Sequence, residues 1–164
     1  MNKRIIDSKL KLPCGVTLNN RLVKSAMSER LSGLKFEPTE GLERLYRNWS
    51  KTGAGLLITG NVIIDRDHLE SMGNVCFDDV KMLPKLRKWA NAGKEGDNQI
   101  WVQISHAGRQ TNRFVNSSSL SPSNVKLNKF GFFGKPKAMS EEDIRNVIKG
   151  FVKASELAKE AGFT

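Results

Sequence analysis

Strand-like apolar segments that alternate with helical patterns predict an α/β fold of the TIM (β/α)8 barrel type. The apolar segments start near residues 22, 56, 99 and 163 of the 164-residue chain, and a hairpin precedes the first. This alternation is typical of βαβ units with parallel strands and right-handed crossovers. A doubly wound sheet would also satisfy it, but no GxGxxG fingerprint follows the first strand, which favours the barrel.

The N-terminal segment predicts a short hairpin followed by a core strand. Pro13 and Gly15 break the first extended piece, and Asn19 and Asn20 supply turn residues. We expect the first strand of the sheet to extend from Leu22 to Met27.

The next unit pairs an amphipathic helix with a buried strand. Thr39 is placed to cap a helix that continues to about Lys51, with apolar residues three and four positions apart. The run "GLLITGN", residues 55–61, is apolar without alternation. Such a run is typical of a parallel strand that is covered on both faces.

Two further helices and one strand complete the pattern. A helix is expected from about Asp78 to Ala92, with Pro84 dividing it into two short pieces. The strand "QIWVQIS" follows at residues 99–105. Ser140 with Asp143 three residues later forms a variant capping box, and the helix that starts there should end at Gly162.

Polar and small residues follow each of the three predicted strands. In a barrel the C-terminal strand ends build the active site, so Ser25 to Ser28, Asn61 and Gln103 should converge there. Asn61 and Gln103 each carry a donor and an acceptor, which suits the edge of a heterocycle. Gly60 would let such a ligand approach the backbone. Any one of these residues could merely order a loop, but three successive strand ends favour a ligand site.

The charge balance leaves one other class of function open. Lys and Arg total 27 against 17 Asp and Glu, which gives a formal net charge of +10. Nucleic-acid-binding proteins share such an excess. Here the basic residues are scattered and form no run, which favours a solvated enzyme surface.

The remaining composition predicts the setting of the protein. Two cysteines make no disulfide framework, no secretory signal is visible, and the longest apolar run is far short of the roughly 20 residues that span a bilayer. We therefore expect a cytoplasmic protein with free thiols, a small-molecule substrate, and neither a nucleic-acid nor a membrane partner. With His68 and His106 as its histidines, a metal site is not expected.

Several of these segments together resemble the Old Yellow Enzyme family of flavin oxidoreductases. The matching pieces are "LNNRLVKSAMS", "GAGLLITGNVIIDRDHLESMGN", "QIWVQISHAGRQ", "LSPS" and "MSEEDIRNVIKGFVKASELAKEAGF". The resemblance implies an FMN-binding TIM barrel that takes a hydride from NAD(P)H onto the flavin and passes it to an activated alkene, such as an α,β-unsaturated carbonyl.

The resemblance also implies roles for individual residues. Ser25, Ala26, Met27 and Ser28 would lie along the flavin, with the Ser28 hydroxyl near N5 and O4. Asn61 would sit beside the ring, and Gln103 would bind its pyrimidine edge.

The sequence departs from the family pattern at several positions. Many members have Pro at the position of Ala26, and Cys or Thr at that of Ser28. Some have a Tyr near Arg30, so Arg30 could favour an acidic ligand or simply face solvent. We expect His106 and Arg109 to order the long loop that continues to Pro122.

The resemblance places residues 1–164 in the N-terminal portion of a single FMN-binding barrel domain. The family's substrate-binding His-His or His-Asn pair and its proton-donating Tyr would follow a fourth strand, so no catalytic residue is assigned. We expect the chain to lack turnover alone. Two alternatives are a half-barrel that assembles with a second chain or copy, as a homo-oligomer, and a basic nucleic-acid-binding module.

Overall fold

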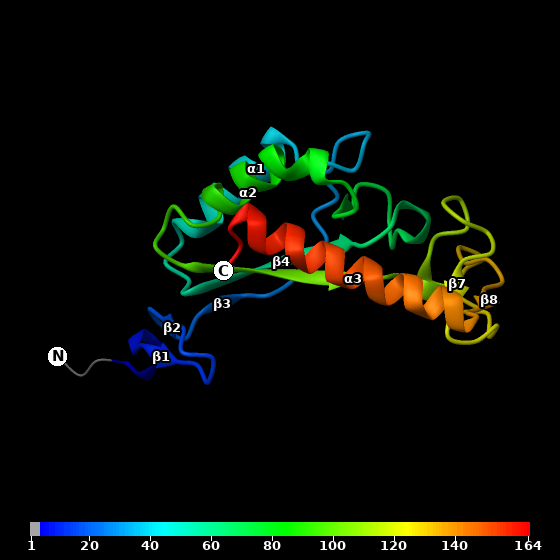
Figure 1. Cartoon of the computed structure of the whole chain (residues 1–164). Helices are drawn as coiled ribbons and strands as arrows, with labels where there is room; N and C mark the ends of the chain where they lie inside the picture. Colours follow the sequence, from blue (N-terminus) through cyan, green and yellow to red (C-terminus); the bar gives the residue numbers. More distant parts are fainter. Residues whose placement is uncertain (1–3) are drawn as a thin grey trace.

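A computed structural model describes residues 4–164 and contains a parallel sheet with all three α-helices on one of its faces (Figure 1). The sheet is formed by β3 (Val23–Lys24), β4 (Leu56–Ile63), β5 (Val75–Cys76) and β6 (Gln99–Ser105). The central strand is β4. β6 pairs along the length of β4, β3 pairs with the beginning of β4, and β5 pairs with the end of β4. The parallel neighbours β3, β4 and β6 follow chain order, as the barrel prediction requires.

The other elements lie around this sheet. The hairpin strands are β1 (Leu10–Lys11) and β2 (Thr17–Leu18), the helices are α1 (Glu40–Ser50), α2 (Leu83–Ala92) and α3 (Glu141–Ala161), and a small separate parallel pair is formed by β7 (Leu120–Ser121) and β8 (Lys137–Ala138). Short 3-10 turns span Ile5–Asp7, Arg66–His68, Val80–Met82 and Gly108–Gln110. Within residues 4–164, no helix combines the length and apolarity needed to cross a membrane.

The helix ends are set by local capping. The Thr39 hydroxyl accepts the Leu42 N–H at the start of α1. Ser140 and Asp143 form the predicted capping box at the start of α3, and Gly162 ends that helix with a φ of 88°. α2 begins later than expected, because Pro84 lies in its first turn, where the missing N–H costs nothing. Residues 80–82 before it form a 3-10 turn.

The first strand is shorter than predicted. Leu22 to Met27 was expected as one strand, but β3 contains two residues, Val23 and Lys24. After Lys24 the chain leaves the ladder and crosses β4, since the Met27 carbonyl lies against the backbone of Gly60. β5 then pairs with the end of β4, at Val62 and Ile63.

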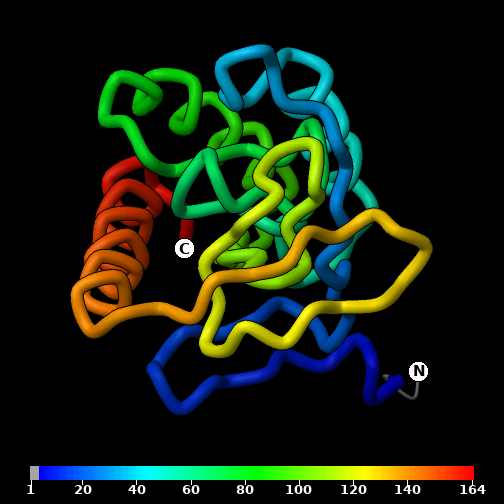
Figure 2. The backbone as a smooth tube through the Cα atoms, turned by 90° about the vertical axis from the view of Figure 1, so that its right-hand side faces the viewer, coloured from blue at the N-terminus to red at the C-terminus, as the bar shows by residue number. Residues whose placement is uncertain are grey.

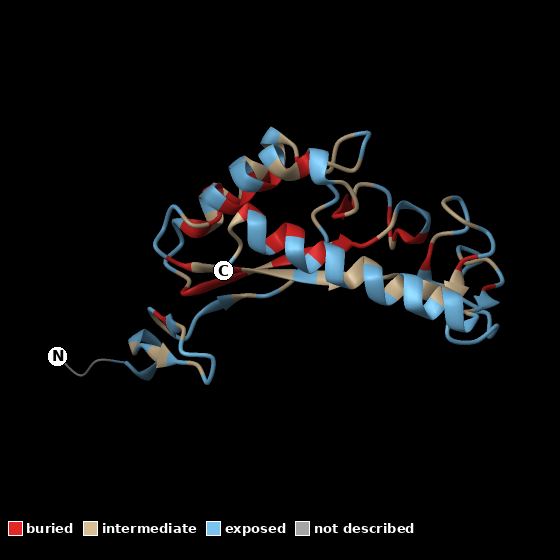
Figure 3. Cartoon of the chain, viewed as in Figure 1, coloured by how far each residue is buried: buried red, intermediate tan, exposed pale blue. Residues whose placement is uncertain are grey.

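The hydrophobic core lies between the sheet and the three helices, and the buried residues gather there (Figure 3). Trp89 on α2 is at its centre. Its ring packs edge-on against Tyr46 of α1 at 5.2 Å and against Phe163 at 5.3 Å between centroids. In the described part of the chain, no helix covers the opposite face of the sheet, which we call the open face.

The segment of residues 106–139 lies at the C-terminal ends of the strands. In the view toward these ends it passes in front of the sheet (yellow in Figure 2). The hairpin lies at the other end, where Asn19 Nδ2 donates to the Asp97 carbonyl at 2.6 Å. Residues 106–139 are therefore the part of the chain placed to border a ligand site at the strand ends.

Candidate functional site

The open face presents two amide side chains next to each other. Asn61 on β4 and Gln103 on β6 are direct register partners, so their side chains project to the same face. The register between the two strands shifts between Ile58 and Asn61. Thr59 stabilises this bulge, because its buried hydroxyl accepts the Gln103 N–H at 3.0 Å. Gln103 is exposed and its side chain bonds to no other group in residues 4–164. It is free to bind a ligand.

The segment from Ser25 to Ser28 crosses the same strand end. Ser25, Met27 and Ser28 are exposed and Ala26 is half-buried. A Cβ at Gly60 would lie 2.1 Å from the Met27 carbonyl oxygen, so only glycine permits this crossing. The prediction that Gly60 leaves room for a ligand is therefore wrong, because the chain itself occupies that space.

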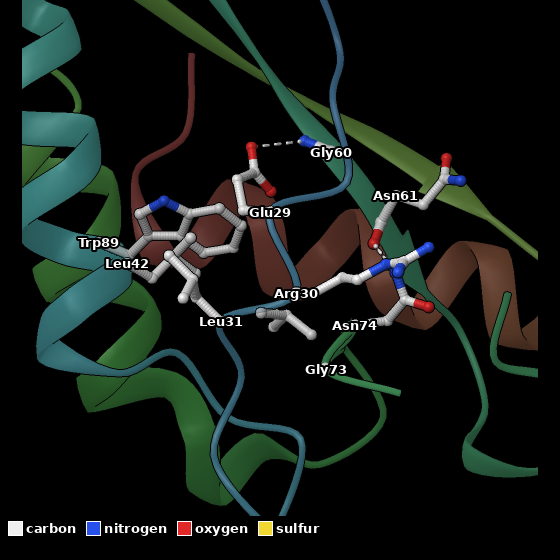
Figure 4. Close-up of a pocket in the computed structure, with 10 residues that line it drawn as sticks. Glu29, Arg30, Leu31, Leu42, Gly60, Asn61, Gly73, Asn74 and Trp89 are labelled. Carbon is white, nitrogen blue, oxygen red and sulfur yellow. Dashed lines mark hydrogen bonds between the residues drawn. The ribbon is translucent and has the colours of Figure 1, made fainter. Parts of the chain in front are cut away.

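A buried ion pair anchors the crossing segment. Glu29 Oε1 lies 3.3 Å from Lys24 Nζ, and their side chains are 9% and 11% exposed. The Tyr46 hydroxyl donates to the same oxygen at 2.6 Å, and the Gly60 N–H donates to it at 3.3 Å (Figure 4). Burial lowers the pKa of Lys24, and burial together with Glu29 raises the pKa of Tyr46. This network fixes where Ser28 and Arg30 leave the sheet.

Glu70 is a site residue that the sequence motifs do not indicate. Its Oε2 accepts the Ser28 hydroxyl at 2.8 Å and Asn61 Nδ2 at 3.0 Å. Burial of Glu70 acts to raise its pKa, but the hydrogen bonds from Asn61 and Ser28 outweigh it, and the pKa is lowered. An ionised carboxylate thus joins two of the predicted flavin contacts.

A cavity of about 560 Å³ lies beside these residues. A volume of this size is ordinary for a small-molecule site. Its lining residues come from the segment after β3, the loop after β4 and the segment after β6, namely Arg30, Glu70, Ser71, Met72, Gln110, Asn112, Phe132 and Phe133. Loops that follow three strands therefore line one cavity, which meets the predicted flavin-contact residues at Glu70.

Two histidines connect the long segment to the loop after β4. His68 Nε2 accepts the Leu120 N–H at 2.9 Å, and His106 Nδ1 accepts the Gly108 N–H at 3.2 Å. The two rings stack with centroids 4.2 Å apart. His106 orders the loop as expected. Arg109 is exposed and forms no side-chain hydrogen bond within residues 4–164, so the structure gives it no such role.

The same histidines meet Asp65. Atoms of Asp65, His68 and His106 that could act as metal ligands lie within 4.8 Å of one another. However, each imidazole accepts a backbone N–H through its other nitrogen, so the nitrogens facing Asp65 carry the protons. A metal requires lone pairs there, and the cluster therefore suits proton sharing better than metal binding.

The structure places all six residues that were predicted to contact the flavin at the C-terminal strand ends. The sequence analysis did not identify Glu70 and His68 as site residues. Both lie in the loop after β4, where no periodic pattern marks a functional position. Their signal in the sequence is the polar stretch "DRDHLE", residues 65–70, which directly follows the apolar run of β4. Parallel strands in chain order, with helices on one face and amide groups at the strand ends, define this chain as barrel-type with a small-molecule site.

Comparisons with known proteins agree with this class. The family model for NADH:flavin oxidoreductases and NADH oxidases matches residues 10–164. The chain is 31% identical to the NADH-dependent flavin oxidoreductase iliE of Hypocrea jecorina over 93% of its length, and 35% identical to the NADH-dependent flavin oxidoreductase nadA of Aspergillus parasiticus over 88%. The chain therefore belongs to the NADH:flavin oxidoreductase / NADH oxidase family, whose flavin is FMN.

Solved structures show the same fold. The old yellow enzyme homologue of Zymomonas mobilis superposes with a TM-score of 0.84 at 18% identity, over 96% of this chain and 46% of that one. Morphinone reductase gives a TM-score of 0.83 at 18% identity, with the same coverage. The chain spans 43% and 36% of the two fungal relatives, so it corresponds to less than half of their length.

Proposed function

We propose that residues 1–164 form the N-terminal, ring-binding portion of a single FMN-dependent oxidoreductase domain. The whole enzyme would transfer a hydride from NAD(P)H through the flavin to an activated alkene such as an α,β-unsaturated carbonyl. The observation that carries this proposal is the adjacent placement of Asn61 and Gln103 on the open face, with Ser25 to Ser28 crossing at the same strand end. The choice of FMN as the cofactor follows from membership of the family.

The residues present fit a flat heterocycle with mixed donors and acceptors. Gln103 offers a free amide, and Asn61 offers its Oδ1 together with the N–H that Glu70 does not use. The segment of Ala26, Met27 and Ser28 crosses the same strand end, and its Met27 carbonyl lies against Gly60, the residue before Asn61. FMN bound here would supply the redox chemistry, while these side chains hold and orient its ring.

This proposal is tested by FMN binding to the purified chain. Gln103→Ala removes hydrogen bonds to the ring and should weaken FMN affinity about tenfold, because each such bond contributes about 1 kcal/mol. Gln99→Ala, at the opposite end of β6, is the matched control and should leave the affinity unchanged. Flavin absorbance after removal of free FMN gives the measurement. A parent chain that retains no flavin would contradict the proposal, as would equal losses in the two variants.

We also propose that the chain self-associates. Beside β6 lies an apolar groove of about 590 Å³, lined by residues of β6 and the last turns of α3. Ile144, Ile148 and Val152 of α3 are exposed next to it in sequence. Contiguous apolar surface and an open strand edge both favour pairing with another chain.

We also propose that the protein resides in a reducing compartment such as the cytoplasm, because its cysteines are free thiols. Cys14 is exposed and Cys76 is buried, and the two are not paired. Burial raises the pKa of the Cys76 thiol, so it is inert at neutral pH.

A further inference from the structure

Arg30 stands out because its backbone adopts a conformation that side-chain-bearing residues avoid. Its φ is 57°, in the left-handed region. Among the four residues other than glycine with positive φ in residues 4–164, only Arg30 lines the cavity of about 560 Å³ beside the candidate site. A left-handed conformation is strained for a residue with a side chain, and such strain at a cavity indicates a functional demand.

The neighbouring backbone enforces this conformation. Gly73, itself at a φ of 89°, packs against the Arg30 backbone so closely that a Cβ would lie 2.7 Å from the Arg30 carbonyl oxygen. The Ser32 N–H donates to the Gly73 carbonyl at 3.0 Å and closes the contact. The arrangement aims the Arg30 side chain toward Asn61 and Asn74 (Figure 4). The packed backbones of Arg30 and Gly73 thus fix the direction in which the Arg30 side chain leaves the chain.

That guanidinium lies close enough to the Glu70 carboxylate to help lower the pKa of Glu70, but the two do not form an ion pair. Within residues 4–164, Arg30 forms no ion pair and no side-chain hydrogen bond, and its side chain is exposed to the cavity. The other charge on the lining, Glu70, already accepts from Ser28 and Asn61. Arg30 is therefore the group on this lining that can bind an anion, and its planar fork matches a carboxylate.

The rest of the lining predicts what carries the anion. Met72 and Phe132 are 66% and 52% exposed although both are apolar, and Phe133 lies beside them. Gln110 and Asn112 add amide groups. We infer that Arg30 is a specificity-determining residue that binds the carboxylate of a ligand with an aromatic or apolar body. The inference rests on the proposed function, because the cavity adjoins the residues assigned there to FMN.

Binding of trans-cinnamate to the purified chain, with cinnamyl alcohol as the uncharged match, tests this assignment by calorimetry. The parent chain should bind cinnamate about tenfold more tightly than the alcohol. Arg30→Lys should keep most of this preference and Arg30→Gln should abolish it. Equal affinities for acid and alcohol, no cinnamate binding, or an unchanged preference in Arg30→Gln would each overturn the inference.

Thermal unfolding separates a ligand-binding role from a structural one. Arg30→Gly relieves the left-handed backbone, so its unfolding midpoint should equal or exceed that of the parent while cinnamate binding is lost. Phe130→Gly, at an exposed left-handed residue outside the cavity, is the matched control. A clear drop in the midpoint of Arg30→Gly alone would make Arg30 structural. FMN retention, measured separately, tests the proposed function, so the two failures are distinguishable.

Discussion

His106 shows how one buried ring couples the stability of the fold to pH. Its side chain is 7% exposed, and Nε2 lies 3.8 Å from Asp65 Oδ2, beyond hydrogen-bonding distance. Burial, aided by the neighbouring His68, lowers the pKa of His106 to about 4. The folded chain therefore keeps this ring neutral under conditions in which the unfolded chain protonates it.

We expect His106 to make the protein less stable as the pH falls from about 6.5 to about 4. In this window the unfolded state binds the proton and the folded state does not, so the free energy of unfolding declines, by up to about 3 kcal/mol. Below about 4 the folded ring is protonated too and the effect stops. Urea unfolding at pH 7 and pH 4.5 measures it.

His106→Asn is the test variant, because its Oδ1 can replace Nδ1 as acceptor for the Gly108 N–H but cannot titrate. The difference in stability between pH 7 and pH 4.5 should be smaller in this variant than in the parent by most of that amount. An identical difference would mean that other groups cause the pH dependence.

Single residues at strand ends were largely predictable, whereas their partners were not. Asn61 and Gln103 could be placed because a strand's end can be seen in its own sequence. Glu70 could not, because it reaches Ser28 across 42 positions of chain and lies in an irregular loop. No local rule predicts such a contact.

At the scale of elements, the capping box makes the start of α3 a local property. Ser140 Oγ accepts the Asp143 N–H at 3.2 Å, and Asp143 Oδ2 accepts the Ser140 N–H at 2.9 Å. Ser140→Ala should therefore lower the free energy of unfolding by about 1 kcal/mol. Ser155→Ala is the control, since this exposed mid-helix hydroxyl bonds back to the Phe151 carbonyl and alanine favours helix. Chemical denaturation of both variants gives the comparison, and a loss in Ser155→Ala equal to that in Ser140→Ala would refute the assignment.

The same distinction explains which elements the sequence predicted. α1 and α3 are long and capped by their own side chains, so their pattern was sufficient. β5, β7 and β8 contain two residues each and exist only through pairing with distant segments. β3 was predicted too long for a related reason, since the crossing over Gly60 depends on a residue far along the chain.

At the scale of the whole molecule, the one-sided core leaves apolar surface on α3 and along β6. If a second copy covers this surface, Ile148→Lys should shift sedimentation velocity toward the monomer, because a charge would have to be buried. Leu34→Lys, at an exposed apolar position in the turn before α1, should have no effect. The net charge of +10 opposes association, so added salt should strengthen it. A parent chain that sediments as a monomer at every concentration would exclude self-association.

The register shift in β4 has a consequence for how this site could be altered. Side chains alternate along a regular strand, so Ile58 and Asn61, three positions apart, would lie on opposite faces if β4 had no bulge; the register shift between them puts both on the same face. Deleting Thr59 or Gly60 would remove the bulge and leave Asn61 opposite Gln103, but it would remove either the hydroxyl that accepts the Gln103 N–H or the glycine that the crossing of Met27 requires. The extra residue in β4 therefore allows the strand to carry both the Thr59 hydroxyl and the Gly60 crossing point while Asn61 stays opposite Gln103.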